Sequence, residues 1–357
     1  MMRKKRLLLL ALLPPFFLTG CWDKKDPEDR AFIITLGVDS TLTGCSFTFA
    51  PANIETGEEE TYTAESDTLA GAVAQVDTRT SRKTDLGQLK TVILGRNLLE
   101  NSAKLDSLLR ELERSQTVSE KVMLLATDGS AAECVEAAMA EDSKTGLFLW
   151  DFYKNTAREV AVTKGMDLDT FLTEREEQGG NGIIPRISAV DGKLQLGGGM
   201  AVTPTAVYTM DEEKERGYLF LLGEAEGALL EGEYQGETLP VEIGKTHVFY
   251  DFSEVGDSIL CTITLPVEGT LQGGSGHLLS RESRKDLEKI FEAIIKGEVE
   301  HTLKIAMGAG EDLFGILPRL QRAMPHLAEE YGRDTLWDAM VFEIYPELEL
   351  KDMGRKR

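Results

Sequence analysis

The chain has 357 residues, of which 42% are hydrophobic and 28% are charged, and its net charge at pH 7 is −22. This composition is typical of a globular protein with about two or three domains and excludes a disordered chain. Because so negative a surface repels phosphate groups, we expect no nucleic-acid partner and no polybasic patch that binds anionic lipids.

Residues 1–20 predict a lipoprotein signal peptide. A basic stretch at residues 3–6 precedes an apolar run at residues 7–18, which is too short to span about 30 Å of hydrocarbon. The run ends in "LTGC", which fits the bacterial lipobox, in which the cysteine thiol is diacylated and becomes the first mature residue. We therefore expect a lipid anchor at Cys21; the alternative is a buried cysteine after a crude transmembrane segment. Loss of the basic stretch would bring the net charge to −26.

The other cysteines, Cys45, Cys134 and Cys261, are widely spaced and form no CxxC pair. We expect all three to be small buried hydrophobic residues, with a single disulfide as the alternative.

Residues 21–30 form a charged tether, and residues 31–178 predict an N-terminal α/β-type domain, which could contain two subdomains. Short runs rich in β-branched residues predict strands at residues 31–39, 45–53, 88–95 and 120–128. Between them, a helix is predicted after Asp67, an amphipathic leucine helix follows Leu98, and a third helix starts at Ser130. Residues 145–176 also have a helical pattern. This alternation predicts helices packed on a mixed sheet.

The glycine-rich residues 179–190 are the predicted linker, and residues 191–357 are the predicted C-terminal α+β domain. A hairpin turning at Asp191-Gly192 comes first, and strands are predicted at residues 206–210, 218–223, 239–252 and 258–271. The strongest helix signal follows, an apolar stripe made of Leu287, Ile290, Phe291, Ile294 and Ile295. A second helix follows Asp312, and residues 340–350 predict a closing strand. The expected fold class is α+β and multi-domain, with a β-rich C-terminal part crossed by one long amphipathic helix.

We find no pattern for catalysis, for a metal or for a cofactor, and predict none. The four histidines stand apart without metal-ligand spacing, namely His247, His277, His301 and His326. Ser275 does not lie in a nucleophile elbow, because His277 stands where the GxSxG pattern has its final glycine. Gly197-Gly198-Gly199 lacks the spacing of a phosphate loop, so close backbone packing or a bulge is the preferred interpretation. The aromatic cluster at residues 148–153 is interpreted as core.

Four segments, in order along the mature chain, resemble the Ger(x)C family, the lipoprotein C subunit of bacterial spore germinant receptors. They are Cys21-Trp22-Asp23 followed by "FIITLGVD", then "LKTVILGRNLLE", then "LQLGGGMAV", and finally "EDLFGILPRLQRAMP" followed by Trp337 and the closing strand. The aromatic residue often found after the proline in the last segment is replaced by His326-Leu327.

The resemblance implies a non-enzymatic, lipid-anchored protein on the outer face of the spore inner membrane. It would act beside two integral membrane subunits, A and B, in a receptor that starts germination in response to small nutrients. Direct binding of the nutrient to this chain is left open. The alternatives are a solute-binding lipoprotein of an importer, which requires two similar α/β lobes, and a surface-anchored hydrolase, which requires a catalytic set.

Overall fold

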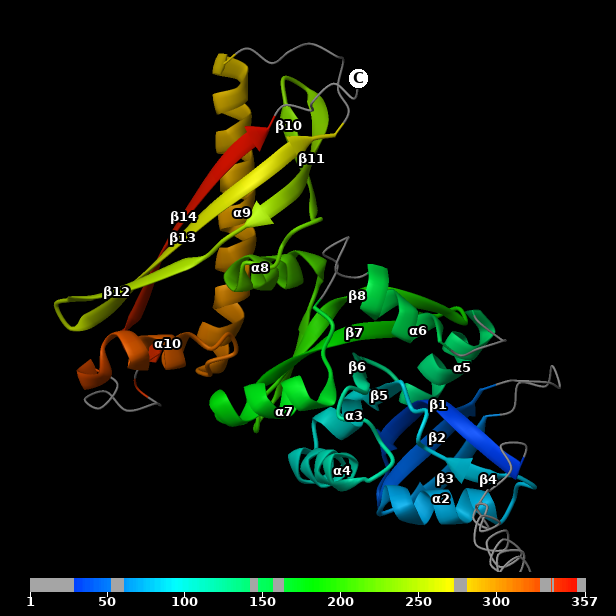
Figure 1. Cartoon of the computed structure of the whole chain (residues 1–357). Helices are drawn as coiled ribbons and strands as arrows, with labels where there is room; N and C mark the ends of the chain where they lie inside the picture. Colours follow the sequence, from blue (N-terminus) through cyan, green and yellow to red (C-terminus); the bar gives the residue numbers. More distant parts are fainter. Residues whose placement is uncertain are drawn as a thin grey trace, which may run out of the picture.

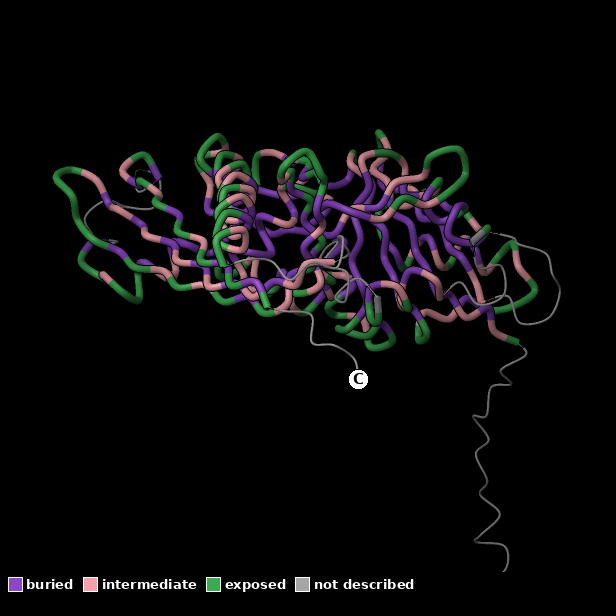
Figure 2. Tube along the Cα trace, turned by 90° about the horizontal axis from the view of Figure 1, so that it is seen from above, coloured by how far each residue is buried: buried purple, intermediate pink, exposed green. Residues whose placement is uncertain are grey.

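The computed structural model describes residues 29–52, 61–141, 147–156, 164–272, 281–327, 335 and 337–351. Within these residues the chain builds two sheets, which lie toward opposite ends of an elongated molecule (Figures 1 and 2). The two sheets and the helices on them confirm the expected α+β, multi-domain fold class.

The first sheet has nine strands in the described residues, in the order β3-β2-β1-β5-β6-β7-β8-β9, with β4 beside β1. Pairing is parallel from β1 through β5 and β6 to β7, and antiparallel in the other pairs of this order. The strands are β1 (Arg30–Ser40), β2 (Cys45–Pro51), β3 (Tyr62–Ser66), β4 (Lys83–Asp85), β5 (Thr91–Gly95), β6 (Met123–Thr127), β7 (Gly182–Val190), β8 (Lys193–Val202) and β9 (Val207–Met210).

Helices cover both faces of this sheet, and its central strands are therefore buried on both sides. In β5, Val92 and Leu94 pack in one apolar cluster with leucines of α4, whereas Ile93 packs in another with Val135 of α5. The helices are α2 (Leu69–Asp77), α3 (Arg96–Leu99), α4 (Ser102–Arg114), α5 (Ala131–Glu141), α6 (Phe148–Asp151), a π-helix η3 (Phe152–Thr156) and α7 (Leu168–Glu177). The helix expected after Asp67 is α2, and Thr68 caps it by accepting a hydrogen bond from the amide of Gly71.

The linker predicted at residues 179–190 was wrong over most of its length. Residues 182–190 form β7, which pairs with both β6 and β8 inside the first sheet. The hairpin turn at Asp191-Gly192 is confirmed, and both residues have positive φ. The glycines of this segment therefore lead into a strand of the first sheet and do not mark a boundary between domains.

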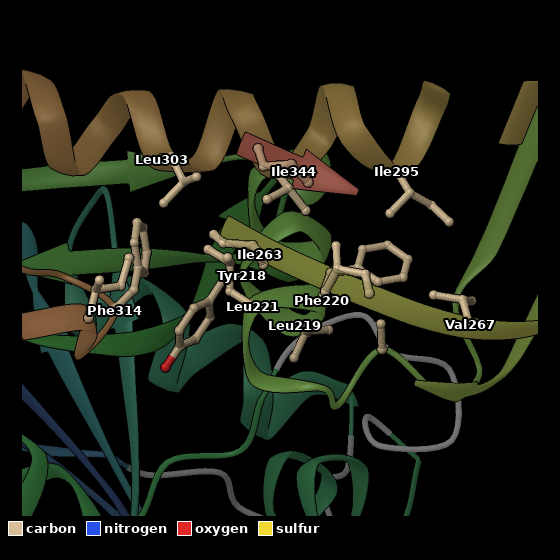
Figure 3. Close-up of a cluster of buried hydrophobic side chains, with 14 of the residues drawn as sticks. Tyr218, Leu219, Phe220, Leu221, Ile263, Val267, Ile295, Leu303, Phe314 and Ile344 are labelled. Atoms are coloured by element: carbon tan, nitrogen blue, oxygen red, sulfur yellow. The ribbon is translucent and has the colours of Figure 1, made fainter. Parts of the chain in front are cut away.

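The second sheet consists, in the described residues, of β10 (Leu229–Tyr234), β11 (Glu237–Thr246), β12 (Phe249–Val255), β13 (Ser258–Leu271) and β14 (Met340–Lys351). Strand β13 is central: β11 and β12 pair with it antiparallel, and β14 pairs with it in parallel. Helix α9 (Arg281–Ala309) lies across this sheet, so Ile295 and Leu303 point at Ile263 and Ile344 (Figure 3). Helix α10 (Ile316–Ala323) follows it.

The strand predicted at residues 218–223 was wrong, because these residues end helix α8 (Glu212–Leu222). Asp211 caps the helix by accepting a hydrogen bond from the amide of Lys214, and Gly223 ends it in the left-handed conformation. Tyr218 to Leu221 are all buried between the two sheets (Figure 3). The second half of α8 is buried on all its faces and shows no amphipathic period, which is why its sequence resembles a strand.

Candidate functional site

The predicted lipidation residue, Cys21, lies outside the described residues, as do Ser275 and His277. Strand β1 begins at Arg30, nine residues after Cys21 in the sequence. No helix of the described chain is long and apolar enough to cross a membrane.

Polar residues gather at the carboxyl ends of parallel strands, where α/β sheets commonly place ligands. Asp39, at the end of β1, accepts hydrogen bonds from the Ser130 hydroxyl at 3.0 Å and from the amides of Ala131 and Ala132 at 3.0 and 3.2 Å. The carboxylate therefore caps the start of α5. Its oxygens join a strand to a helix.

Asp128 follows β6 and binds two arginines. Arg96 donates to one of its oxygens at 2.9 Å and Arg186 to the other at 3.0 Å, while the Thr209 hydroxyl donates at 2.7 Å. Partial burial alone would raise the pKa of Asp128, but the hydrogen bonds from Thr209 and Arg186 and the two positive charges lower it. The cluster connects β5, β6, β7 and β9 by charge-assisted bonds. Charged residues directly after buried strands were the sequence signal that could have identified it.

The glycine run of β8 is confirmed as a site of close packing. Gly198 has a φ of +74°, and a Cβ there would overlap the carbonyl oxygen of Met210 and press on Arg186. A Cβ on Gly199 would overlap the carboxylate of Glu215, which is 1% exposed. The absence of side chains lets β9 and α8 approach the strand.

Cys45, Cys134 and Cys261 are buried and free, as expected. Burial raises the pKa of all three thiols, that of Cys261 to about 12, so none carries thiolate at neutral pH. Among the described residues, no group of three or more histidine, cysteine, aspartate or glutamate side chains could hold a metal ion.

The aromatic cluster at residues 148–153 packs on the α5 face of the first sheet. Tyr153 is 4% exposed, and Phe148, Trp150 and Phe152 are partly buried against the same apolar cluster, which confirms the core interpretation. Trp150 also lies beneath two ammonium groups, with Lys154 at 5.4 Å and Lys90 at 5.8 Å from its ring centroid.

An open groove of about 1170 Å³ runs between the two halves of the molecule. Lys121, Trp150 and Lys164 line it from the first half, and Glu224, Lys245 and His247 line it from the second. Lys121 and Lys164 are already paired with acidic residues, Lys121 with Asp167 and Asp169, and Lys164 with Glu174. Its walls thus carry mixed charge rather than a convergent set of ligand-binding groups.

Comparisons with known proteins identify the family. Residues 23–189 match the model of the spore germination protein N-terminal domain, and residues 198–351 match that of the spore germination B3/GerAC-like C-terminal domain. The spore germination protein GerQC of Bacillus cereus is 22% identical over 194 residues, and this alignment covers 53% of each protein, so the chain spans about half the length of this curated relative. The crystal structure of the GerBC protein has a similar fold, with a TM-score of 0.60 and 14% identity, covering 88% of this chain and 96% of that one. The chain belongs to the Ger(x)C family of spore germination proteins.

Proposed function

We propose that this chain is the lipid-anchored, non-enzymatic C subunit of a nutrient germinant receptor and acts through protein contacts with integral membrane A and B subunits. The observation that carries the proposal is the match to both family models, which in order cover nearly the whole chain after Cys21. Lipoproteins and membrane association are typical of this family, which agrees with the lipobox at residues 18–21. The proposed location is the outer face of the spore inner membrane.

The polar clusters described above favour a binding protein over an enzyme. Asp39, Asp128 and Arg186 are engaged in bonds between strands and helices, which leaves them to hold the fold. The importer alternative requires two similar lobes, whereas the two sheets here differ in strand order and in helix cover.

The lipid anchor is tested by metabolic labelling with a fatty-acid analogue. Cys21→Ala should abolish labelling and release the chain from the anchored pool. Cys134→Ala, which changes a buried thiol, should keep the label. Label that persists on the Cys21→Ala protein would refute the anchor.

Function is tested by deleting the gene and by isolating the detergent-solubilised receptor. We expect this chain to copurify with two polytopic proteins, and the deletion to abolish the response to one nutrient class while germination by non-nutrient triggers continues. His277→Ala and Ser275→Ala should leave that response intact. Loss of response in either variant, at normal protein level and complex recovery, would contradict the non-enzymatic assignment.

A further inference from the structure

The outer face of the second sheet carries an unusual gathering of exposed apolar side chains. Eight large hydrophobic side chains of the described residues are exposed, and four of these share this one face: Phe249, Val255, Val341 and Tyr345, with exposed fractions of 61, 57, 48 and 49%. Their neighbours in sequence on β12 and β14, such as Phe252 and Ile344, point the other way into the core under α9. Contiguous exposed apolar surface marks interaction sites more often than scattered residues do.

Strand register arranges these side chains in rows across β12, β13 and β14. One row consists of Ser253, Leu260 and Val341, and the row two residues along consists of Asp251, Thr262 and Glu343. The next row consists of Phe249, Thr264 and Tyr345. Two rows that each hold two apolar or aromatic side chains and one hydroxyl side chain, here called the apolar rows, thus flank an acidic row. Successive rows are about 7 Å apart because each strand residue advances about 3.4 Å. We call these three rows the outer-face patch.

The acidic row is held in place by the apolar row beside it. The Tyr345 hydroxyl donates a hydrogen bond to Glu343 at 2.7 Å, so the carboxylate lies along the sheet beside the aromatic ring. Farther along β14, Lys351 pairs with Glu349 at 2.6 Å, which takes up the positive charge of that end of the strand. The patch therefore presents negative charge between apolar groups.

The neighbouring edge of β14 is closed over its carboxyl half. Glu292 accepts a hydrogen bond from the amide of Leu348 at 3.0 Å, and Glu288 accepts one from the amide of Leu350 at 3.1 Å. Pro346 has no backbone N–H that could donate a hydrogen bond to another strand. These features disfavour addition of another strand along this half of the edge, whereas the outer face of the sheet is exposed.

The negative charge of the patch determines which kind of partner can bind there: a second copy of this chain, a bilayer surface or another protein. A second copy of this chain would oppose Asp251 and Glu343 to the same residues, and both copies carry a strongly negative net charge. An anionic bilayer surface would be repelled for the same reason. A protein surface with a lysine or arginine between two apolar groups matches the rows in both charge and spacing.

We propose that the outer-face patch is a docking surface for a protein partner that places a cationic side chain between Asp251 and Glu343 and apolar side chains on the flanking rows. The identity of this partner rests on the proposed function, since the A or B subunit would supply the surface. The patch belongs to the half of the molecule that contains α9 and extends along the β12–β13 ribbon, which projects beyond the helices (Figure 1).

Site-specific photo-crosslinking in the full chain tests the proposal. A benzophenone amino acid is placed at Tyr345 or Phe249, and at Leu42 as the control, which is fully exposed in the first half of the molecule. In spore membranes, we expect both patch positions to crosslink to a second protein through a peptide that contains a lysine or arginine beside apolar residues. A yield no higher than at Leu42, a dimer of this chain, a lipid adduct or an acidic partner peptide would each overturn it.

Charge reversal provides the second arm. Glu343→Lys should lower recovery of the receptor complex about tenfold, whereas Glu113→Lys, an exposed change on α4, should not. Both variants should keep the wild-type thermal midpoint, because both side chains are exposed. Unchanged recovery with Glu343→Lys overturns the patch alone. If polytopic proteins are missing from every preparation, the wild type included, the proposed function fails as well.

Discussion

Arg216 on α8 and Glu298 on α9 form an ion pair across the junction of the two halves, with Nη2 of the arginine 2.5 Å from Oε1 of the carboxylate. The two helices touch at this point: the Thr302 hydroxyl donates to the Lys214 carbonyl at 2.7 Å, and a Cβ on Gly217 would lie 2.5 Å from the Glu298 carbonyl oxygen. Helix α8 also packs on β8 of the first sheet, where Gly199 makes room for Glu215. This one helix therefore connects both sheets.

Removing Arg216 should destabilise the protein more than removing an exposed cation from α9. Arg216→Met leaves Glu298 buried without its partner and should cost about 2–3 kcal/mol, below the ~3–5 kcal/mol of a fully buried pair because part of Arg216 is exposed. Lys296→Met, which breaks only a surface pair with Glu300, should cost less than about 0.5 kcal/mol. Urea denaturation at neutral pH measures both, and equal losses would contradict a special role for the junction.

Gly198 should tolerate a methyl group far less than Gly192 does, although both have a φ of +74°. At Gly192 a Cβ meets no atom within 4 Å, so Gly192→Ala should cost about 1 kcal/mol from backbone strain alone. Gly198→Ala adds overlap with the Met210 carbonyl, which raises the expected cost to roughly 3 kcal/mol. Thermal unfolding of the two variants compares them, and similar midpoints would show that β9 can move away without penalty.

The fold was predictable where a segment shows a clear period, and also at the short apolar runs of β5 and β6, which are buried throughout. Strand β13 alternates buried and half-buried residues along its length, and α9 repeats its apolar residues at helical spacing, so both were found. Helix α8 ends in a buried apolar run without that period and was misassigned as a strand; the end of β7 was expected as part of the hairpin at Asp191-Gly192, but its start was assigned only to the linker. The rows of the outer-face patch depend on the register between β12, β13 and β14, which no single segment encodes.

The apolar stripe of α9 needs one correction, and this gives a prediction. Leu287, Phe291 and Ile295 are fully buried, whereas Ile290 and Ile294 are only partly buried at the side of the stripe. Ile295→Ala should therefore cost about 2–5 kcal/mol, and Ile294→Ala clearly less, because part of its surface remains in water. Denaturation midpoints of the two variants measure these losses of stability. A larger loss for Ile294→Ala than for Ile295→Ala would contradict the burial of Ile295 in the core.

Asp128 should supply stability that disappears in acid. Its folded-state pKa is lowered, so this contribution is fully present above the unfolded pKa of about 3.9 and is lost as the pH falls through the folded value. Asp128→Asn removes the charge but keeps the shape, and should cost about 1–2 kcal/mol at pH 7 because Arg96 and Arg186 lose a shared carboxylate. Urea denaturation at pH 7, 5 and 3 should show that the difference in free energy of unfolding between wild type and variant persists at pH 5 and narrows at pH 3.

Asp257→Asn, in the exposed turn between β12 and β13, is the control and should leave stability nearly unchanged at pH 7 and pH 5. A gap that stays constant down to pH 3 would mean that Asp128 acts through packing rather than through its charge.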